Sequence, residues 1–415
     1  MGSQSPTNAS SAEHSLPWFA TSRGVIFVAA FLTRLGCAAY ILSTYFGPQL
    51  LYLQNEPSHI AAALASGLGF SSPYANTPTT PTAQQPPLYP LLLAGVFKVF
   101  GIFTVRSAWT AVSINILAGA ITAILVYHVG RLHFSEKAGV FAAWLWVVPW
   151  GYRSTSLSVS LSNGSLAALG LTALFLWTPK TLSNRSRWFA LGVYCGLLVL
   201  LQTSLLTVVV IYAGWLAVAK PGSTPMRWSR VGVAAAGILL ALAPWSARNY
   251  STFGRLIPIR DNFGLELWVG NRPGMHGTMD FEGDFPDHDP TNYVRLGELP
   301  FMDAKLDEAR AFILRDPSAF GRRFLLRIVE FWYFPYPFSW IVFSIAGWLG
   351  AAAALWKDRR NWVWLAILAV FPVVYYITHN FASYRDPVQP LIILLAAYFT
   401  VEMIALARSS FSSSD

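Results

Sequence analysis

Ten long apolar stretches constrain the fold of this 415-residue chain more than any other feature of its sequence. A helix needs about 20 apolar residues to cross the hydrocarbon core of a bilayer, and stretches near this length, some of them shorter, recur along the whole chain. They lie near residues 24–46, 104–130, 138–151, 157–178, 188–201, 203–219, 230–247, 332–356, 361–378 and 387–408. We therefore expect an all-α polytopic membrane protein with about ten transmembrane helices.

The composition excludes the main alternatives. Only 12% of the residues are charged and 54% are hydrophobic, so a soluble fold of this size would lack the polar surface it needs. The same values exclude a disordered chain, and two cysteines are too few for a disulfide scaffold. The net charge of +9 does not indicate nucleic acid, because Lys and Arg occur in short runs between the apolar stretches.

The positions of these basic runs predict the orientation of the chain in the membrane. Loops rich in Lys and Arg stay on the cytoplasmic side, and every second loop of this chain has such a cluster. The clusters comprise Arg131, Lys137, Lys180, Arg185, Arg187, Lys220, Arg227, Arg230, Lys357, Arg359 and Arg360. Arg23 and Arg408 would lie on the same side, so we expect both termini in the cytoplasm.

Two long loops on the opposite, outer side are where we expect the function to lie. They cover residues 47–103 and 248–331, and the second loop holds more than half of the chain's 20 acidic residues. We assign both loops to one transmembrane domain, residues 21–410. A polar tail at 1–20, expected to be disordered, and a short tail at 411–415 flank this domain.

Glu56 is the only acidic residue between Glu13 and Glu136, and it follows the first apolar stretch closely. Pro57 and the apolar positions after it predict a helix along the membrane surface, with Glu56 at its N-terminus. Such a carboxylate either complements the helix dipole or acts in catalysis at the membrane face, where partial burial can tune its pKa. The residues alone leave both interpretations open.

Histidines raise the question of a metal ion. His59 would lie on the same helical face as Glu56, and Glu-x-x-His can supply two metal ligands. No third ligand is evident nearby, and His379 is the only other outer-side histidine near a membrane end. A divalent metal ion on Glu56 and His59 stays one alternative, and no other cofactor is indicated.

Three further outer segments have distinct patterns. Residues 88–100 are apolar but too short to cross a bilayer comfortably, so we expect a helix beside the membrane. Residues 300–326 are expected to form one surface helix. The acidic segment 280–290 lacks the Gly and the terminal Glu of the helix-loop-helix calcium pattern, so we expect a solvated loop.

Three motifs, in this order along the chain, resemble the GT-C superfamily of glycosyltransferases that use lipid-linked sugars. The first joins Glu56 to GLGF (67–70) and PPLYPLLLAGVFKVFG (86–101). The others are PWSARNYSTFGRLIPIRDNFGLELWVGN (244–271) and SYRDPVQPLIILLAAY (383–398). The chain is most similar to the bacterial family 39 or PMT-2-like (RgtA/B/C/D-like) proteins, which are allied to protein O-mannosyltransferases and aminoarabinose transferases.

The resemblance implies a GT-C-like bundle in the bacterial cytoplasmic membrane and a hexosyl or pentosyl transferase. Such enzymes pass a sugar, with inversion, from a polyprenyl-phosphate donor to a protein, lipid or polysaccharide acceptor at the outer face. Glu56 would then be the general base, or would hold a metal near the leaving phosphate. The family often has two adjacent acids or an aspartate here, whereas this chain has Asn55 before Glu56.

The leaving lipid phosphate needs positive charge and hydrogen-bond donors. The resemblance points first to Arg385 with Tyr384, then to Arg248, and we expect both arginines to share one outward-facing cavity with the catalytic carboxylate. Arg153, at an outer turn, is a further candidate. For each arginine the alternative is a membrane anchor that reaches to the interface. Gln202 stands where relatives carry a basic residue, so it would not supply this charge.

Two alternatives to an active transferase follow from the sequence. One is a transporter or flippase of a lipid-linked saccharide, although internal repeats and broken helices, which are usual in transporters, are not evident here. The other is a catalytically reduced family member that serves as an assembly partner. The single acid at Glu56 and the uncharged Gln202 keep this second alternative open.

Overall fold

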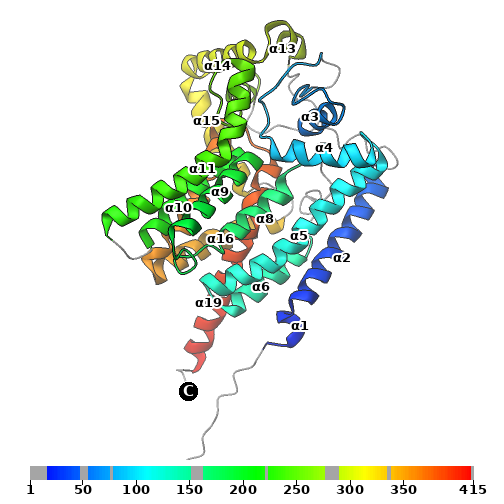
Figure 1. Ribbon diagram of the computed structural model, residues 1–415. Coiled ribbons are helices and arrows are strands. Elements are labelled where there is room, and N and C mark those ends of the chain that lie inside the picture. The colour runs from blue at the N-terminus through cyan, green and yellow to red at the C-terminus, as the bar shows by residue number, and fades with distance from the viewer. Residues whose placement is uncertain are drawn as a thin grey trace, which may run out of the picture.

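The computed structural model describes residues 16–46, 55–74, 78–150, 162–219, 223–275, 289–333 and 338–412, and its regular structure there is helical (Figure 1). The α-helices are α1 (Trp18–Thr21), α2 (Arg23–Ile41), α3 (Glu56–Ala65), α4 (Leu88–Phe100), α5 (Val105–His133), α6 (Glu136–Val147), α8 (Gly164–Leu174), α9 (Arg185–Leu201), α10 (Leu206–Ala219), α11 (Thr224–Phe253), α12 (Phe263–Asn271), α13 (Pro290–Leu296), α14 (Glu298–Arg315), α15 (Pro317–Tyr333), α16 (Phe338–Lys357), α17 (Trp362–Val370), α18 (Val373–Ile377) and α19 (Gln389–Ser412). Short π or 3-10 turns are η1 (Leu42–Phe46), η3 (Thr203–Leu205), η4 (Arg359–Asn361) and η5 (Ala382–Val388). The all-α expectation is confirmed.

Each of the ten expected apolar stretches contains a helix. Six helices in the described ranges are long and apolar enough to cross a membrane: Arg23–Thr44, Val105–His133, Thr224–Phe253, Phe338–Lys357, Arg359–Ile377 and Ala382–Ser410. The other four stretches contain α6, α8, α9 and α10, which have 12, 11, 17 and 14 residues. The count of about ten spans is therefore approximate.

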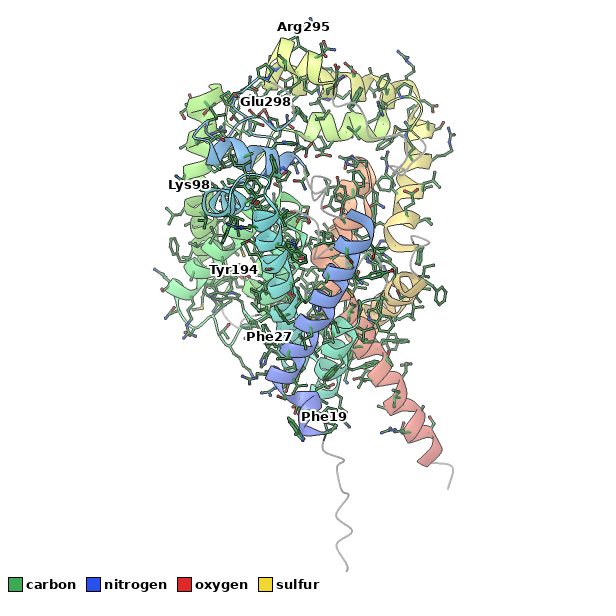
Figure 2. All side chains as sticks on the ribbon, turned by 90° about the vertical axis from the view of Figure 1, so that its right-hand side faces the viewer. Phe19, Phe27, Lys98, Tyr194, Arg295 and Glu298 are labelled. Atoms are coloured by element: carbon green, nitrogen blue, oxygen red, sulfur yellow. The ribbon has the colours of Figure 1, made fainter. Side chains whose placement is uncertain are left out.

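The two ends of the bundle differ, as Figure 1 shows. Helices α3, α4, α13 and α14 gather at one end, which we call the loop end, whereas α1 and the last turns of α19 reach the opposite end. In Figure 2, Arg295 and Glu298 mark the loop end and Phe19 marks the other. Both long loops therefore contribute to the same end of the molecule, as the alternating basic clusters predict.

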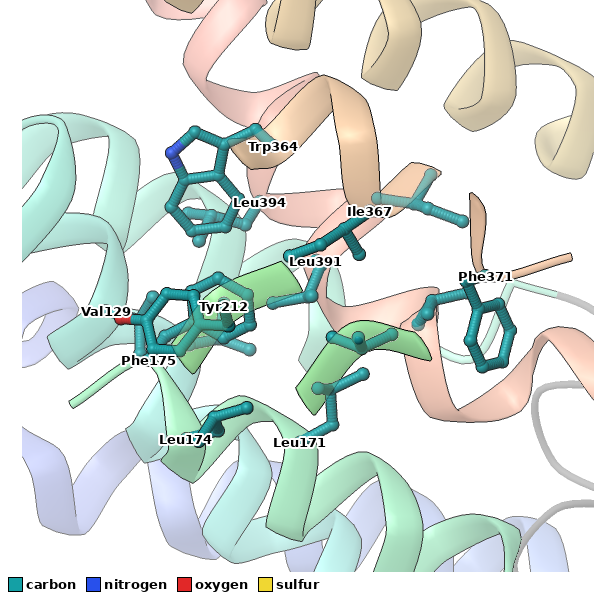
Figure 3. Close-up of a cluster of buried hydrophobic side chains, with 14 of the residues drawn as sticks. Val129, Leu171, Leu174, Phe175, Tyr212, Trp364, Ile367, Phe371, Leu391 and Leu394 are labelled. Atoms are coloured by element: carbon teal, nitrogen blue, oxygen red, sulfur yellow. The ribbon is translucent and has the colours of Figure 1, made fainter. Parts of the chain in front are cut away.

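Aromatic side chains fill the centre of the largest buried cluster, where α8, α10, α17 and α19 meet (Figure 3). Phe175 stacks on Trp364 with ring centroids 4.7 Å apart, and it contacts Tyr212 at 4.5 Å. Such contacts add about 0.5–1.5 kcal/mol each to the free energy gained by burying the rings. The Tyr212 hydroxyl donates to the carbonyl of Trp177 at 2.7 Å, which satisfies its hydrogen bond inside the bundle.

Small residues let α9 and α11 pack backbone to backbone. Gly192 and Gly196, one turn apart on α9, face Ala234 and Ala241 of α11, and Gly237 of α11 faces α9 in return. A Gly-x-x-x-Gly spacing is a common device for close helix contact in membranes. This contact holds the long α11, whose far end reaches the loop end (Figure 1).

Replacing Gly192 with alanine is expected to destabilise the protein, because the added methyl group would meet the Ala234 carbonyl and push α9 from α11. Overpacking of this kind costs about 1–3 kcal/mol. Gly214→Ala in α10 is the matched control, since a methyl group there meets open space. Thermal unfolding in detergent should show a lower Tm for Gly192→Ala alone, and equal Tm values would contradict the close contact.

One expected helix is divided in the structure. Residues 300–326 do not form a single helix, because α14 ends at Arg315 and α15 begins at Pro317. Asp316 lies between them, and its carboxylate accepts a hydrogen bond from the backbone N–H of Ala319 at 2.8 Å. A capping Asp followed by Pro favours a new helix start, and the continuous helical pattern of the sequence obscured this signal.

The helix expected over residues 88–100 is confirmed by α4. Three other expectations concern segments outside the described residues: Arg153, most of the acidic segment 280–290, and the larger part of the tail at 1–20.

Candidate functional site

Glu56 is the first residue of α3, as the sequence predicts. Asn55 caps this helix: its side chain accepts a hydrogen bond from the Ser58 N–H at 3.2 Å, and the Ser58 hydroxyl accepts one from the Asn55 N–H at 2.8 Å. This reciprocal capping box fixes where α3 starts and gives Asn55 a structural task. The Glu56 Oε2 atom accepts a hydrogen bond from the side-chain amide of Gln85 at 2.9 Å.

Arg248 holds the segment that contains Gln85 in place by hydrogen bonds. From α11, its guanidinium donates to the carbonyls of Thr82 at 2.7 Å and Phe70 at 2.8 Å. The Thr82 N–H also donates to the Phe70 carbonyl at 3.1 Å, so the two halves of the first long loop are tied together. Arg248, expected at the lipid phosphate, is thus engaged in holding this loop against α11.

Tyr384 and His379 form a second part of the site. The His379 Nε2 atom lies 2.8 Å from the Tyr384 hydroxyl, and Nδ1 lies 3.3 Å from the backbone carbonyl of Glu266. A carbonyl only accepts, so we assign the ring proton to Nδ1, and Nε2 accepts the hydrogen bond that Tyr384 donates. Burial lowers the pKa of His379, which favours this neutral form.

Glu266 and Arg260 complete this part from α12 and the loop before it. The Glu266 Oε1 atom accepts hydrogen bonds from Arg260 Nη2 at 2.8 Å and from the Asn262 amide at 2.5 Å. Its Oε2 atom lies 3.4 Å from Nε2 of His379. The Arg260 side chain is 25% exposed, and its Nε–H has no hydrogen-bond partner among the described residues. The Nε–H is buried, so a ligand can reach only the exposed quarter of this side chain.

The two parts are near enough for their charges to interact. The charge of Glu56 acts on the phenol of Tyr384, and the charge of Arg260 acts on both Tyr384 and His379. We define the loop-end cluster as Glu56, Gln85, Arg260, Glu266, His379 and Tyr384. It combines two carboxylates, a cation, a neutral imidazole and a phenol, which is an arrangement suited to binding an anion beside a proton acceptor.

Arg260 and Gln202 both act on a third residue, Tyr375. Tyr375 stacks on Tyr384 with ring centroids 4.4 Å apart. The Gln202 amide donates to the Ser204 hydroxyl at 3.2 Å. Both side chains lie near the Tyr375 phenol, on which the charge of Arg260 also acts.

Sequence reasoning missed Arg260 and Glu266, although both belong to the motif 244–271. Arg260 gave a usable signal, since it is an arginine in a loop that the sequence predicts to be outer, where the positive-inside rule disfavours one. Glu266 gave none, because it is one acid among many in its loop.

Arg385 has a different environment from the loop-end cluster. The residue is 1% exposed, and its guanidinium donates to the Ser344 hydroxyl at 2.7 Å, to Gln389 Oε1 at 2.8 Å and to the Trp332 carbonyl at 3.3 Å. These bonds join η5 to α15 and α16. The structure therefore differs from the expectation that Arg385 faces one outward cavity with Glu56 and Arg248.

Arg385→Ala is expected to lower the stability of the protein, and to weaken binding of a lipid-phosphate donor less than Arg260→Ala does, because it acts only through the position of η5. The change leaves buried acceptors on Ser344 and Gln389 without their donor, at about 1–3 kcal/mol for each unsatisfied group. Arg359→Ala is the control, since Arg359 is exposed. Thermal unfolding and donor binding are measured for both variants. An unchanged Tm together with lost donor binding in Arg385→Ala would show that Arg385 binds the phosphate.

The surroundings of His59 do not favour a metal site. Its ring packs edge-on against Phe103, with centroids 5.8 Å apart, and burial lowers its pKa. Across the part of the chain that the structure describes, no group of three or more His, Cys, Asp or Glu side chains is arranged to hold a metal ion. Glu56 and His59 therefore find no third described ligand.

A partly open cavity with a volume of about 50 Å³ lies between α2, α5, α6, α8 and α16, next to η5 and the start of α19. Apolar and aromatic side chains line it together with Arg34, Asp386 and Gln389. Arg34, in the middle of α2, donates to the Trp146 carbonyl at 2.9 Å, and its charge lies 5.1 Å from the Trp146 ring. Asp386 and Tyr384 both belong to η5, so this turn contributes a side chain to the cavity and another to the loop-end cluster.

Comparisons with known proteins agree with the resemblance seen in the sequence. Residues 84–247 match the family model described as dolichyl-phosphate-mannose-protein mannosyltransferase. No curated protein matches the chain.

Among solved structures, the fold is similar to that of the oligosaccharyltransferase from Archaeoglobus fulgidus. Its apo form gives a TM-score of 0.54 at 15% identity, over 94% of this chain and 52% of that chain. Its complex with Zn and sulfate gives a TM-score of 0.54 at 16% identity, over 92% of this chain and 51% of that chain. This chain thus spans about half of the length of the oligosaccharyltransferase.

Proposed function

With the GT-C resemblance confirmed by the matched segment and by the fold, we propose that this protein transfers a sugar from a polyprenyl-phosphate donor to an acceptor hydroxyl. The loop-end cluster carries the proposal, because the charges of the Glu56 carboxylate and the Arg260 guanidinium both act on the same phenol, Tyr384. The name of the matched family refers to a dolichyl-phosphate sugar. We place the reaction at the outer face of the bacterial cytoplasmic membrane and assign the donor sugar to the hexoses or pentoses.

In this proposal Glu56 is the general base. The acceptor oxygen attacks the anomeric carbon on the face opposite the phosphate, so the configuration inverts. The new C–O bond forms as the bond to the phosphate oxygen breaks, and the acceptor proton passes to the Glu56 carboxylate. The hydrogen bond from Gln85 holds this carboxylate in place.

Arg260 binds the leaving phosphate. Negative charge grows on the phosphate oxygens as the sugar leaves, and a preorganised guanidinium stabilises that charge. Glu266 and Asn262 orient Arg260. Arg248 and Arg385 support the site indirectly, by holding the first long loop and η5. The Tyr384 hydroxyl donates a hydrogen bond to His379, so the lone pairs of its oxygen can accept a hydrogen bond from a sugar hydroxyl.

The apolar lining of this cavity supports assigning the lipid part of the donor to the same region of the bundle. Trp146, Trp340 and Phe343 give it an apolar wall, and Asp386 of η5 also lines it. Burial of an isoprenoid tail there would stabilise the complex by about 25 cal/mol for each Å² of apolar surface removed from water.

The proposal is tested with purified protein in lipid nanodiscs, given a labelled sugar on a polyprenyl-phosphate donor and candidate acceptors. We expect a glycosylated acceptor and free polyprenyl phosphate. Counter-transport of intact donor across vesicles, without either product, would instead support a flippase. Transfer that appears only when a second protein is added, and that does not depend on Glu56, would support an assembly partner.

A further inference from the structure

Helix α4 has an apolar side that no described part of the chain covers. Its other side packs through Tyr89, Leu93 and Phe97 into the buried cluster that α4 shares with α3 and α5. On the uncovered side, large apolar side chains continue from α4 into the first turn of α5, and Val99 among them is 74% exposed. These side chains are Leu91, Val99, Phe100, Ile102 and Val105.

The direction of α4 is that of a helix lying in the membrane surface. Figure 1 shows α4 across the loop-end tips of α2 and α5, and its axis crosses the direction of these two helices. Both α5 and the helix that begins with α2 are long and apolar enough to cross a membrane, so α4 lies where two spans end. In Figure 2, Lys98 lies at this level, between Arg295 at the tip of the loop end and Phe19 at the opposite end. The uncovered apolar side chains can therefore enter the leaflet, as those of interfacial helices do.

Two cations border this apolar side. Lys98 is in the last turn of α4 and Arg106 is in the first turn of α5, and both side chains are exposed. The turn between the two helices is tight, because the Thr104 hydroxyl donates to the Phe100 carbonyl at 2.7 Å. Both cations thus lie within a few residues of one corner of the molecule.

Neither cation is neutralised by a described part of the chain. Lys98 and Arg106 form no ion pair with any residue that the structure describes. Glu56, the one acid of this part of the sequence, is bonded to Gln85 before the start of α4, whereas Lys98 lies about 15 Å further along the helix at 1.5 Å per residue. Basic residues are disfavoured in loops expected to be outer, so two of them here call for a negative partner from outside the chain.

We propose that α4 and the start of α5 bind an anionic phospholipid of the leaflet at the loop end. Lys98 and Arg106 bind its headgroup phosphate, since an ammonium and a guanidinium both donate to phosphate oxygens. The uncovered apolar side chains contact its acyl chains. Two cations without an acid favour a lipid with net negative charge over a zwitterionic one, and each cation near an anionic surface strengthens binding about 5-fold. This binding does not depend on the proposed transfer reaction.

A phospholipid probe with a diazirine on its acyl chain tests the site in nanodiscs of phosphatidylcholine that hold the full-length protein. After illumination, labelled peptides are mapped by mass spectrometry. We expect a phosphatidylglycerol probe to label residues 88–106 more than a phosphatidylcholine probe does. The double variant Lys98→Gln/Arg106→Gln should lower this preference by about 25-fold, which is about 5-fold for each charge removed. Equal labelling of this segment by the two probes in wild type would overturn the site.

Arg295→Gln/Arg310→Gln is the charge-matched control. It removes two exposed cations from α13 and α14, which also lie at the loop end but away from α4, and it should keep the wild-type preference. The same loss in both double variants would mean that net charge alone attracts the probe, and would overturn the site. Unlabelled phosphatidylglycerol should compete with the probe. Stronger competition by polyprenyl phosphate would identify a donor site instead and would also overturn the proposal.

A nitroxide label on Val99→Cys, in a protein whose two free cysteines, Cys37 and Cys195, are replaced by serine, reports what covers α4. Oxygen concentrates in the bilayer, whereas a nickel chelate stays in water. We expect the label at residue 99 to be more accessible to oxygen than to nickel, and a label on Arg295→Cys to show the reverse. Access of nickel to residue 99 would mean that water covers α4, and exclusion of both reagents would mean that protein covers it. Either result would overturn the lipid assignment.

Discussion

Glu56→Gln is expected to lower kcat for sugar transfer by about 100- to 10,000-fold, the range that a general base contributes. The amide has the shape of the carboxylate and can still meet Gln85, but it cannot take the proton of the acceptor hydroxyl. The KM for the lipid donor should stay near the wild-type value, because Arg260 and the cavity are unchanged. Initial rates with a labelled donor in nanodiscs measure both quantities.

Glu136→Gln is the matched control for this experiment. Glu136 is also the first residue of a helix, α6, and its carboxylate also accepts a side-chain hydrogen bond, from Tyr127 at 3.2 Å. It lies outside the loop-end cluster, so its kcat should equal that of wild type. Wild-type kcat in Glu56→Gln would show that Glu56 only complements the dipole of α3.

Arg260→Ala is expected to lower kcat/KM by about 100- to 1,000-fold, because the leaving phosphate loses the charge that stabilises it. Part of the loss should appear as a higher KM for the donor, since the phosphate carries charge before the reaction as well. Arg260→Lys should recover part of the activity: it restores the charge but not the planar fork of donors.

Arg255→Ala controls for a general change in the charge of the second loop. Arg255 lies five residues before Arg260, and its exposed side chain pairs with Asp303 at 2.8 Å. Exposed pairs of this kind contribute about 0–1 kcal/mol, so both kinetic constants should match wild type. A wild-type kcat/KM in Arg260→Ala would show that another cation binds the phosphate, and Arg385 would be the first candidate to test.

Much of the fold could be predicted because a membrane helix is encoded locally. Length and apolar composition suffice to place a helix in each expected stretch, and the start of α3 follows from Pro57 in its first turn. The division between α14 and α15 was missed although its signals, Asp316 and Pro317, are local. The helical pattern of the sequence continues on both sides of these two residues and obscured them.

The site was less predictable because it depends on contacts between distant parts of the chain. Glu56, His379 and Tyr384 could be proposed from residue type and position near a membrane end. The partner of His379, Glu266, is distant in sequence and becomes recognisable only when α12 packs beside η5. Arg385 is the opposite case. An arginine at this position suggests phosphate binding, and only its burial among carbonyl and hydroxyl acceptors shows that it connects η5 to α15 and α16.

Three consecutive side chains of η5 have three different surroundings. Tyr384 belongs to the loop-end cluster, Arg385 bonds to α15 and α16, and Asp386 lines the cavity. A single helical turn cannot shift one of these side chains without moving the others, so their mutational effects are not independent. Alanine substitutions along η5 will report on the turn as a unit, and the free energies of single variants should not be summed to rank the three residues.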